Sequence, residues 1–549
     1  MSLMGSFWVG VSGLQTSNNA LNTTAHNMSN LDTTGYTRQQ VSQGTRTYAT
    51  IYKGRPNWQQ IGRGVNYILT RQERDYFLDK NYRRESGRSA FYDVSSTALE
   101  EIEYILGEGQ GGGSIEGHEF STAVTNLWEA VQEMSKDPIS AVNLNLFITR
   151  CYEFVTKGAA VYKSLSQYQD NLNQSIIGEV NNINSYAAEI EDLNRRIVAI
   201  EAGQEHANDL RDRRNYLLDE LSKLANISFS EDITGYMNVR LENMDLVKSG
   251  TVHVIDMYTD PNTGFYTPYW RALANYSLDE DGNRVMTKEG LEGARVFDLT
   301  RTVSSDLNTD IGSLKSMLLA RGDHRATYQE LKDINPDGEY EAGWYDRHIS
   351  QSVIMNVQAE FDQLINIVVT KINDIIAEEA KRVDPTGEDG YLRDENGEPY
   401  QIFKLLNDRG DWSVSNITIN QDLRQNPALL NFRMVEGSED NPAMEALKAA
   451  FEEKIYTLNP NVQTPLSFTD YYTNLVGQVA NSGSVMRGVQ ATQEVATDSL
   501  FNAREQVVGV SSDEELTNMI RFQNAYNASS RYINVISEML EHILTTLGR

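Results

Sequence analysis

The histidines are the first candidates for catalytic or metal-binding chemistry, and seven of them occur among the 549 residues. His118 and Glu119, in the sequence HEFST, form the one place where Glu directly follows His. A zinc protease helix needs a second histidine at position 122, which is a threonine here. The chain also contains no Gly-x-Ser-x-Gly nucleophile elbow and no Gly-Lys-Ser/Thr phosphate loop. We therefore predict no catalytic residues, no metal site and no cofactor.

Cys151 is the only cysteine, so one chain can form neither an internal disulfide nor a cysteine-based zinc or iron–sulfur site. It lies in the apolar run LNLFITRCYEFV. A catalytic thiol needs a nearby histidine or a helix N-terminus to lower its pKa, and the local sequence offers neither. We expect Cys151 to be a buried core residue.

The acidic sequence DEDGN (279–283) resembles the start of a calcium-binding EF-hand loop. Such a loop closes on the metal with a glutamate at its twelfth position, and that position is Gly290 here. A calcium-binding surface module is therefore disfavoured, and we interpret DEDGN as a turn between strands.

The chain is acidic overall, with 48 Lys and Arg against 77 Asp and Glu and a net charge of −29. Phosphate backbones repel such a surface, so we expect no nucleic acid partner. Residues 38–88 are the exception, because they carry eleven Lys and Arg against four Asp and Glu, a local balance of +7. This stretch could be a DNA-binding arm, but we favour ion pairing with the acidic remainder of the chain or of a neighbouring copy.

The hydropathy pattern gives no sign of a membrane segment. No stretch reaches the roughly 20 apolar residues that a spanning helix needs, so we predict no membrane insertion. The first residues, MSLMGSFWVGVSGLQTSNNALN, have no Lys or Arg before an apolar run and no small-residue cleavage site after one. We therefore expect no cleavable secretory signal, and these features alone would favour the cytoplasm.

Helical and strand patterns alternate along the chain and predict a multidomain α+β protein. Helical periodicity occupies about residues 4–30 and most of 70–224, returns at 345–381 and dominates from 442 onward. Between these segments, short alternating runs separated by turn sequences such as DPNTG predict strands. We expect a discontinuous helical coiled-coil stalk built from both ends of the chain, with β-rich outer domains inserted in the middle. The expected parts are a terminal helical coiled-coil domain (1–40 and 515–549), a helical-bundle domain with an extended basic segment (41–225, 345–383 and 441–514), a β-rich outer domain (226–344) and a small β-type insert (384–440).

Apolar residues at alternating three- and four-residue steps run through both ends of the chain, which is the pattern of a coiled-coil seam. A similar seam over residues 172–200 indicates an intramolecular bundle. Each stripe keeps to one face of its helix and needs a partner helix, and the simplest partner for one end is the other end. The seam residues are Phe7, Val11, Leu14, Leu21 and Met28 in the first helix and Phe522, Ile533, Ile536, Leu540, Ile543 and Leu547 in the last.

The segment after the first helix, AHNMSNLDTTGYTRQ (25–39), has the composition of a helix C-terminus followed by extended chain. Asn and Asp tolerate cap geometry, and Gly35 can adopt a positive φ. The segment resembles the signature of the flagellar rod, hook and hook-associated axial proteins, with one departure at Thr34, where that family often has proline. The signature residues are Asn27, Asn30, Thr33, Gly35, Tyr36 and Arg38.

The sequence at 507–544 resembles the C-terminal signature of the same family. Three internal stretches narrow the resemblance to the hook-associated members: NDLRDRRNYLLDELSKLANI (208–227), IGSLKSMLLARGD (311–323) and LSFTDYYTNLVGQVA (466–480). Val508 is a departure, because serine is usual there. The matching C-terminal residues are Asp513, Glu514, Glu515, Arg521, Gln523 and Tyr526.

The resemblance implies a structural subunit of the bacterial flagellum and not an enzyme. Such a subunit is exported unfolded through the flagellar type III channel and folds at the hook tip, in the extracellular flagellum. Its terminal helices continue the inner tube of the hook, and a ring of its copies joins the hook to the filament. The implied partners are further copies of itself, the flagellar hook protein, the second hook–filament junction protein and a cytoplasmic export chaperone on the C-terminal helix.

Two other functions fit parts of the sequence. The hook protein shares both terminal signatures and is the nearest structural alternative. A flagellar enzyme with an inserted hydrolase domain is the distant alternative, and the missing catalytic motifs argue against it.

Overall fold

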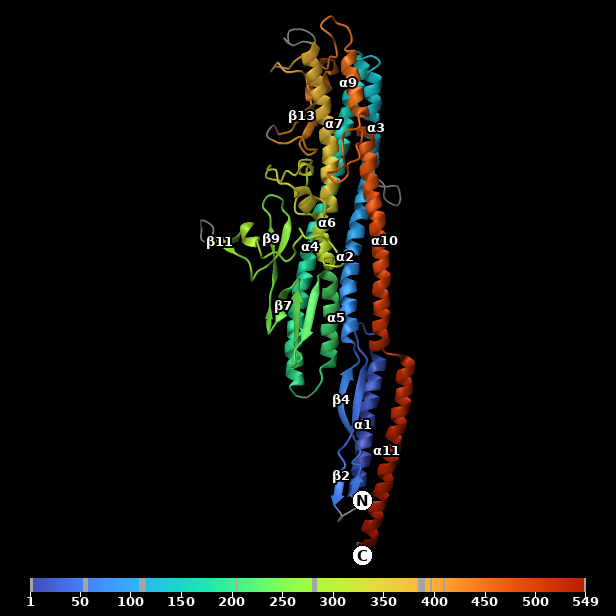
Figure 1. Ribbon diagram of the computed structural model, residues 1–549. Coiled ribbons are helices and arrows are strands. Elements are labelled where there is room, and N and C mark those ends of the chain that lie inside the picture. Colours follow the sequence, from blue (N-terminus) through green and yellow to red (C-terminus); the bar gives the residue numbers. More distant parts are fainter. Residues whose placement is uncertain are drawn as a thin grey trace. The chain divides into compact units, whose positions relative to one another are not determined.

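The computed structural model describes residues 3–52, 58–107, 115–203, 205–278, 284–383, 391–394, 397–407 and 410–547. The chain forms two compact units, each assembled from separated segments (Figure 1). The terminal unit comprises residues 1–87, 182–254 and 494–549, and the central unit comprises residues 88–181 and 255–493. Three long helices contribute residues to both units: α2 (Tyr76–Leu106), α4 (Ala141–Glu201) and α10 (Phe468–Val508).

The two ends of the chain pair within the terminal unit. Helix α1 (Leu3–Ser29) lies beside α11 (Ser512–Leu547) (Figure 1). The pair is antiparallel, because Gly10 lies against Ile533 while Asn27 hydrogen-bonds Glu515 near the start of α11. An antiparallel ribbon also contacts α1. Its strands are β1 (Gln39–Thr45) with β4 (Val65–Gln72), and β2 (Ala49–Tyr52) with β3 (Trp58–Ile61).

The terminal unit also contains helix α5 (Asn208–Leu224) and an antiparallel four-stranded sheet of order β5-β6-β7-β8. Alternate residues of β6 are buried, which is the pattern of a sheet with one face against a core. Asn194 of α4 fixes this sheet, since it donates to the Met237 carbonyl oxygen at 2.8 Å and accepts from the Met237 amide at 3.1 Å. The strands are β5 (Ile227–Glu231), β6 (Met237–Leu241), β7 (Met244–Lys248) and β8 (Thr251–Val252).

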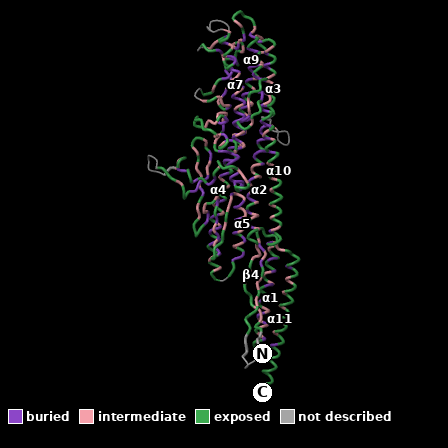
Figure 2. The backbone as a smooth tube through the Cα atoms, in the orientation of Figure 1, coloured by how far each residue is buried: buried purple, intermediate pink, exposed green. Residues whose placement is uncertain are grey.

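The central unit is mainly helical. Its core joins α3 (Ile115–Met134), α7 (Val353–Val383) and α9 (Asn441–Glu452) to parts of α2, α4 and α10, and most of α7 is buried (Figure 2). At the centre of this core, the ring of Phe120 lies 4.9 Å from the rings of both Phe361 and Tyr472. Cys151 is fully buried in the same core, as predicted, and burial raises the pKa of its thiol.

Short strands and turns make up the rest of the central unit. Its strand pairs are β9 (Ile255–Thr259) with β10 (Tyr266–Trp270), β11 (Tyr276–Leu278) with β12 (Arg284–Met286), and β13 (Phe403–Leu405) with β14 (Ile417–Ile419). Its short helices are the 3-10 turns Glu289–Leu291, Glu330–Lys332 and Pro427–Leu429, α6 (Ser313–Arg321), the π-helical turn Tyr345–Ile349 and α8 (Gln421–Gln425).

The predicted fold class is confirmed: the chain is α+β, its two ends pack together as helices, and β-rich segments lie between them. The middle differs in detail, because the described strands of the 226–344 region end at Met286 and the rest holds turns and α6. The division into two compact units does not test the boundaries of the four predicted parts, and these boundaries stay a prediction. The glycine-rich sequence at 107–117, which predicts a connection between helices, is described only at Gly107 and at 115–117, where α3 has already begun. The hairpin turn that the sequence predicts at Asp389 and Gly390 lies outside the described residues.

Candidate assembly site at the paired ends of the chain

Asn27 is the centre of the contact between the two ends of the chain. It lies in the last turns of α1 and is 1% exposed. Its amide nitrogen donates to the Gln39 carbonyl oxygen at 2.9 Å and to Glu515 at 3.2 Å. Its amide oxygen accepts from the Tyr36 hydroxyl at 2.7 Å and from the Gln39 backbone N–H at 3.1 Å. Both ends of this buried amide are therefore satisfied, and one side chain joins α1, β1 and α11.

Arg38 makes the charged part of the same contact. Its guanidinium Nε lies 2.9 Å from Glu515, and its Nη1 lies 2.9 Å from Glu514 and 3.7 Å from Glu73. Burial alone would lower the pKa of Arg38, but the neighbouring carboxylates, Glu515 first, raise the pKa above its usual value. Glu514 and Glu515 also lie in the first turn of α11, where the helix dipole favours negative charge. The ion pair and the dipole thus favour the same arrangement.

The residues between α1 and β1 form a tight turn. The Thr33 hydroxyl donates to the Asn30 side chain at 3.2 Å, and the Tyr36 backbone N–H donates to the Thr33 carbonyl oxygen at 3.1 Å. Gly35 has a φ of 80°, and a Cβ added there would lie 3.2 Å from Tyr216. Burial, followed by the charges of Asp212, Asp209 and Glu515, raises the pKa of Tyr36. The phenol therefore stays protonated and keeps donating to Asn27.

The remaining C-terminal signature residues do not join this cluster. Asp513, Arg521 and Gln523 are exposed, and the Arg521 guanidinium lies over the ring of Phe522 at 4.8 Å from its centroid. Tyr526 is half-buried. The structure thus brings Asn27, Tyr36, Arg38, Glu514 and Glu515 together, and Asp513, Arg521 and Gln523 lie outside this cluster.

The contact face of α1 differs from the predicted seam. Gly10, Gly13 and Asn27 of α1 lie against α11. They belong to a stripe of small, mostly buried residues at four- and three-residue steps: Ser6, Gly10, Gly13, Ser17, Ala20, Thr24 and Asn27. A Cβ added at Gly10 would lie 2.7 Å from Ile533, and one at Gly13 would lie 2.8 Å from the Ser529 hydroxyl. Small side chains occupy this contact face because they let the two helix backbones approach closely.

The predicted seam residues are placed as follows. Phe7, Val11, Leu14 and Leu21 are half-buried on the adjacent face of α1, and Met28 is exposed. On α11, Phe522, Ile533 and Leu540 are half-buried, Ile536 is buried and Ile543 is exposed. The side chain of Leu547 lies outside the described residues.

Large apolar side chains remain exposed on both terminal helices. On α11, Tyr532, Val535, Met539 and Ile543 follow three- and four-residue steps along one face and are 37–49% exposed. On α1, Met4 and Trp8 are 56% and 59% exposed. Contiguous apolar surface of this kind is typical of an interface with another molecule. We call the residues on α11 the outer row.

Several residues of the site escaped the sequence argument. The Arg38 backbone N–H donates to the Val508 carbonyl oxygen at 2.9 Å, and Gln72 donates to Asp212 at 2.7 Å. Burial raises the pKa of the Asp212 carboxyl from 3.8 to about 6. Asp212 lies in the stretch 208–227 that carried part of the family resemblance, and its buried carboxyl gave no signal in the local pattern.

The basic segment pairs within its own chain. In the terminal unit, Arg83 and Arg504 contact the two oxygens of Asp219 at 2.6 and 2.7 Å, and Arg74 contacts Asp79 at 3.0 Å. In the central unit, Arg88 contacts Asp310 at 2.9 Å. The expectation of ion pairing between residues 38–88 and the acidic remainder is thus confirmed for Arg83 and Arg88, whereas Arg74 pairs within the segment and Arg504 lies outside it. These pairs argue against a DNA-binding arm.

The described residues hold no group of three or more His, Cys, Asp and Glu side chains placed to bind a metal ion. Glu119 of the HEFST sequence pairs with Lys157. DEDGN (279–283) lies outside the described part of the chain. Among the helices that the structure describes, none has the length and apolar character needed to cross a membrane.

Comparison with known proteins identifies the protein families that this chain matches. Residues 99–389 match the helical domain of flagellar hook-associated protein FlgK. Residues 506–546 match the C-terminal family of the flagellar basal body rod FlgEFG proteins, and residues 7–37 match the flagella basal body rod protein family. The two rod-type matches cover the paired ends described above.

Full-length relatives agree with these matches. The chain is 25% identical over 539 residues to flagellar hook-associated protein 1 of Bacillus subtilis (strain 168), covering 96% of this chain and 95% of that protein. It is 22% identical over 564 residues to the protein of the same name from Escherichia coli (strain K12), covering 97% and 98%. The fold resembles that of the flagellar hook junction protein FlgK from Burkholderia pseudomallei, with a TM-score of 0.54, 11% identity and coverage of 79% of this chain and 100% of that one. Because the FlgK helical-domain family matches more than half of the residues, the chain belongs to the flagellar hook-associated protein FlgK family and is a structural subunit of the bacterial flagellum.

Proposed function

We propose that the chain forms the hook–filament junction by assembling, through α1 and α11, with further copies of itself and with the hook protein. The observation that carries this proposal is the outer row of α11. At 25 cal/mol per Å² of apolar surface, covering several such side chains on each copy supplies several kcal/mol per contact, on the order needed for a stable lattice. The resemblance to junction proteins supports placing that lattice at the hook tip, in the extracellular flagellum.

The same surface explains the need for export control. Before assembly, an exposed apolar row on a helix would drive aggregation, so we propose that a cytoplasmic chaperone covers α11 until the type III channel accepts the chain. The second hook–filament junction protein is the proposed partner on the filament side. No catalytic activity belongs to this proposal, because an assembly subunit needs none.

A pair of substitutions tests the role of the outer row. Val535→Gln with Met539→Gln should leave the isolated chain folded, because both side chains are about half exposed, 46% and 49%. The variant should fail to enter the flagellum, and cells carrying it should shed filament subunits into the medium. Val142→Gln is the matched control, since Val142 is 76% exposed at the start of α4, outside the terminal unit. Normal filaments on cells with the double variant would refute the proposal.

A truncation and a polymerisation assay distinguish a hook–filament junction subunit from the hook protein. Removal of residues 519–549 should abolish incorporation at the hook tip while the β strands of both units stay folded. If the full chain were instead the hook protein, the purified protein would polymerise into long curved tubes. A junction subunit should not do so, and electron microscopy of concentrated protein distinguishes the two outcomes.

A further inference from the structure

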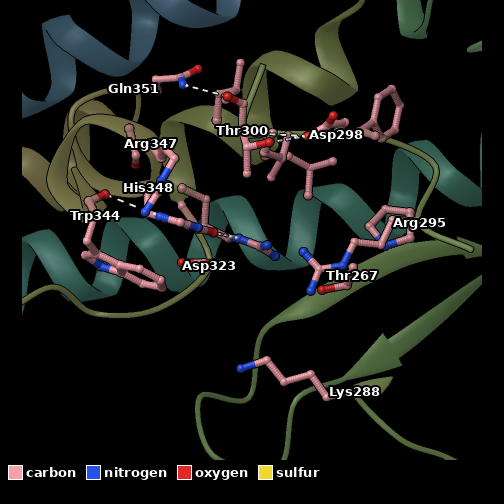
Figure 3. A pocket seen from close by; sticks show the side chains of 18 of the residues that line it. Thr267, Lys288, Arg295, Asp298, Thr300, Asp323, Trp344, Arg347, His348 and Gln351 are labelled. Carbon is pink, nitrogen blue, oxygen red and sulfur yellow. Dashed lines mark hydrogen bonds between the residues drawn. The ribbon is translucent and has the colours of Figure 1, made fainter. Parts of the chain in front are cut away.

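A cavity of about 460 Å³ lies in the central unit (Figure 3). Two of the arginines that line it are engaged elsewhere in the chain, since Arg321 donates to Asn173 at 2.6 Å and Arg347 pairs with Glu341 at 2.5 Å. No set of described side chains in the cavity wall selects a ligand. The linker between α10 and α11, in the terminal unit, offers a clearer case, because one residue contacts the chain on both sides of it.

The linker between the two helices is short. Helix α10 ends at Val508 and α11 begins at Ser512, so residues 509–511 alone connect them. A Cβ added at Gly509 would overlap the Glu505 carbonyl oxygen, so the chain can leave α10 in this direction only with glycine at that position. The linker, the last turns of α10 and all of α11 belong to the terminal unit.

Helix α11 is held loosely along its length. Among its described side chains, at 512–546, only Glu515 and Ile536 are buried. Its main packing partner is α1, where the contact includes Gly10 and Gly13. Small residues permit a close approach of two helices but bury little apolar area, so the contact is weak for its length.

Helix α1 is held from a second side as well. It packs against β1 and β4, and the Val65 backbone N–H of β4 donates to the Ser12 hydroxyl at 3.3 Å. A Cβ added at Gly64 would lie 3.3 Å from the Val9 Cα, which shows how closely the ribbon lies on the helix. We therefore expect α1 to stay in place when α11 is removed.

Arg38 contacts both sides of the linker. Its backbone N–H donates to the Val508 carbonyl oxygen at 2.9 Å, at the end of α10. Its guanidinium lies 2.9 Å from Glu514 and from Glu515, in the first turn of α11. The Glu515 side chain is 3% exposed, so loss of the guanidinium would leave a buried carboxylate with the Asn27 amide as its remaining described donor.

We propose that α11 is a strap that opens about residues 509–511 and that Arg38 is its latch. In the closed state α11 covers Gly10 and Gly13 of α1. In the open state α11 leaves as one segment, while α1, the ribbon and the rest of the terminal unit stay folded. Opening exposes the Ile533 side of α11 in addition to the outer row, so only the open state lets a binding partner surround the helix. The strap rests on contacts within one chain and does not depend on the proposed junction.

Double electron–electron resonance spectroscopy on the full chain tests the strap. One spin-label pair, at Asn22→Cys and Asn534→Cys, joins exposed positions of α1 and α11. A second pair, at Asn22→Cys and Asn66→Cys, joins α1 to an exposed position of β4. The native Cys151 is fully buried and stays unlabelled.

Arg38→Gln should raise the fraction of molecules with long α1–α11 distances about tenfold, because charged hydrogen bonds are lost. The α1–β4 distance should not change. Glu514→Gln should have a smaller effect than Arg38→Gln, since the Glu514 side chain is 62% exposed. Arg46→Gln is the matched control, because it removes the same charge from an exposed position of the same segment, and it should leave both distances as in the wild type.

An α1–α11 distance distribution that is the same in Arg38→Gln and in the wild type would refute the latch. Equal broadening of both distances would show that the terminal unit unfolds as a whole, and it would refute the strap. Failure of the junction proposal would appear instead as normal filaments on cells with Val535→Gln and Met539→Gln, and it would not alter these distances.

Discussion

At the scale of single residues, the Asn27 side chain is placed so that only an amide satisfies its surroundings. Two donors, the Tyr36 hydroxyl and the Gln39 N–H, face its oxygen, and two acceptors, the Gln39 carbonyl and Glu515, face its nitrogen. An isosteric carboxylate would keep the first pair and repel the second. The signature position therefore has a physical reason to be asparagine, independent of any partner molecule.

We predict that Asn27→Asp destabilises the contact of α1 with α11 by roughly 3 kcal/mol, because it buries a carboxylate against two acceptors. Hydrogen exchange of the β1 amides and of the first turns of α11 measures the loss. Adding Glu515→Gln should recover part of it by placing a donor opposite the new carboxylate. Asn19→Asp, at an exposed position of α1, is the matched control. Unchanged protection in Asn27→Asp would contradict the assigned role.

Asp362 gives the central unit a pH dependence. It is fully buried on α7, and its carboxylate accepts from the Val414 N–H at 2.6 Å and the Tyr328 N–H at 3.0 Å. Burial raises its pKa from 3.8 to about 7. Between these two values the folded chain holds a proton that the unfolded chain has released. The unfolding free energy therefore falls as pH rises through this window, by up to roughly 1.4 kcal/mol per pH unit from this group.

Urea unfolding of the central unit at several pH values between about 4 and 7 measures that slope. Asp362→Asn should flatten the slope of the unfolding free energy against pH. It should also lower the unfolding free energy by an amount that does not vary with pH, because the new amide NH2 group faces one of the two backbone N–H donors. Asp374→Asn, at an exposed position of the same helix, should leave the slope as in the wild type. Equal slopes in all three proteins would show that Asp362 does not titrate in this range.

At the scale of elements, the small-residue face of α1 decides how closely the two terminal helices approach. We predict that Gly10→Ala weakens the pairing of α1 and α11, because its Cβ would lie 2.7 Å from Ile533. The overlap outweighs the gain in helix propensity of about 1 kcal/mol. Gly488→Ala, where a Cβ on α10 meets nothing within 4 Å, should show only that gain.

A second substitution checks the cause of the Gly10→Ala effect. Adding Ile533→Ala removes the side chain that the new Cβ would meet, so the double variant should regain protection of the α11 amides relative to Gly10→Ala alone. Hydrogen exchange of residues 519–546 provides the measurement. Additive losses in the two single variants would mean that the helices are not in the predicted close contact.

The helices themselves could be predicted from periodicity, but the contact face of α1 could not. Phe7, Val11 and Leu14 attracted the coiled-coil assignment because they are the largest apolar residues of the helix. Packing instead uses Gly10 and Gly13 one position away, since helices joined by small residues can come closer. A hydrophobicity pattern indicates which residues are buried but not how closely two helices approach each other, so it does not identify a contact face made of small residues. The ion pair of Arg38 with Glu514 and Glu515 was equally hidden, because nothing local relates positions 477 residues apart.

At the scale of the whole molecule, the exposed apolar surface of the terminal helices predicts where the isolated chain is least protected. We expect the amides of α1 and α11 to exchange faster than those of α7 in the monomer and to become protected on assembly. Mass-spectrometric hydrogen exchange on monomer and on isolated hook–filament complexes compares the two states. Core-like protection of both terminal helices in the monomer would contradict this expectation.

The net charge of −29 opposes association of copies. Because salt screens such repulsion, raising the salt concentration from about 0.02 M to about 0.5 M should shift the purified chain towards oligomers, as measured by analytical ultracentrifugation. The Val535→Gln, Met539→Gln variant should not respond, since its apolar contact is lost. Dissociation of wild-type oligomers by salt would show that ion pairs, and not the outer row, hold the copies together.

The hydrogen bond between Asn27 and Glu515 joins residues separated by 488 positions. Helix α1 can therefore pair with α11 only when the long segment between them is also present, whether the N-terminus or the C-terminus is exported first. A prematurely terminated product would display the small-residue face of α1 with nothing to cover it and could not offer the joined surface that a growing structure recognises. We therefore expect that a product without α11 is not incorporated into the assembly.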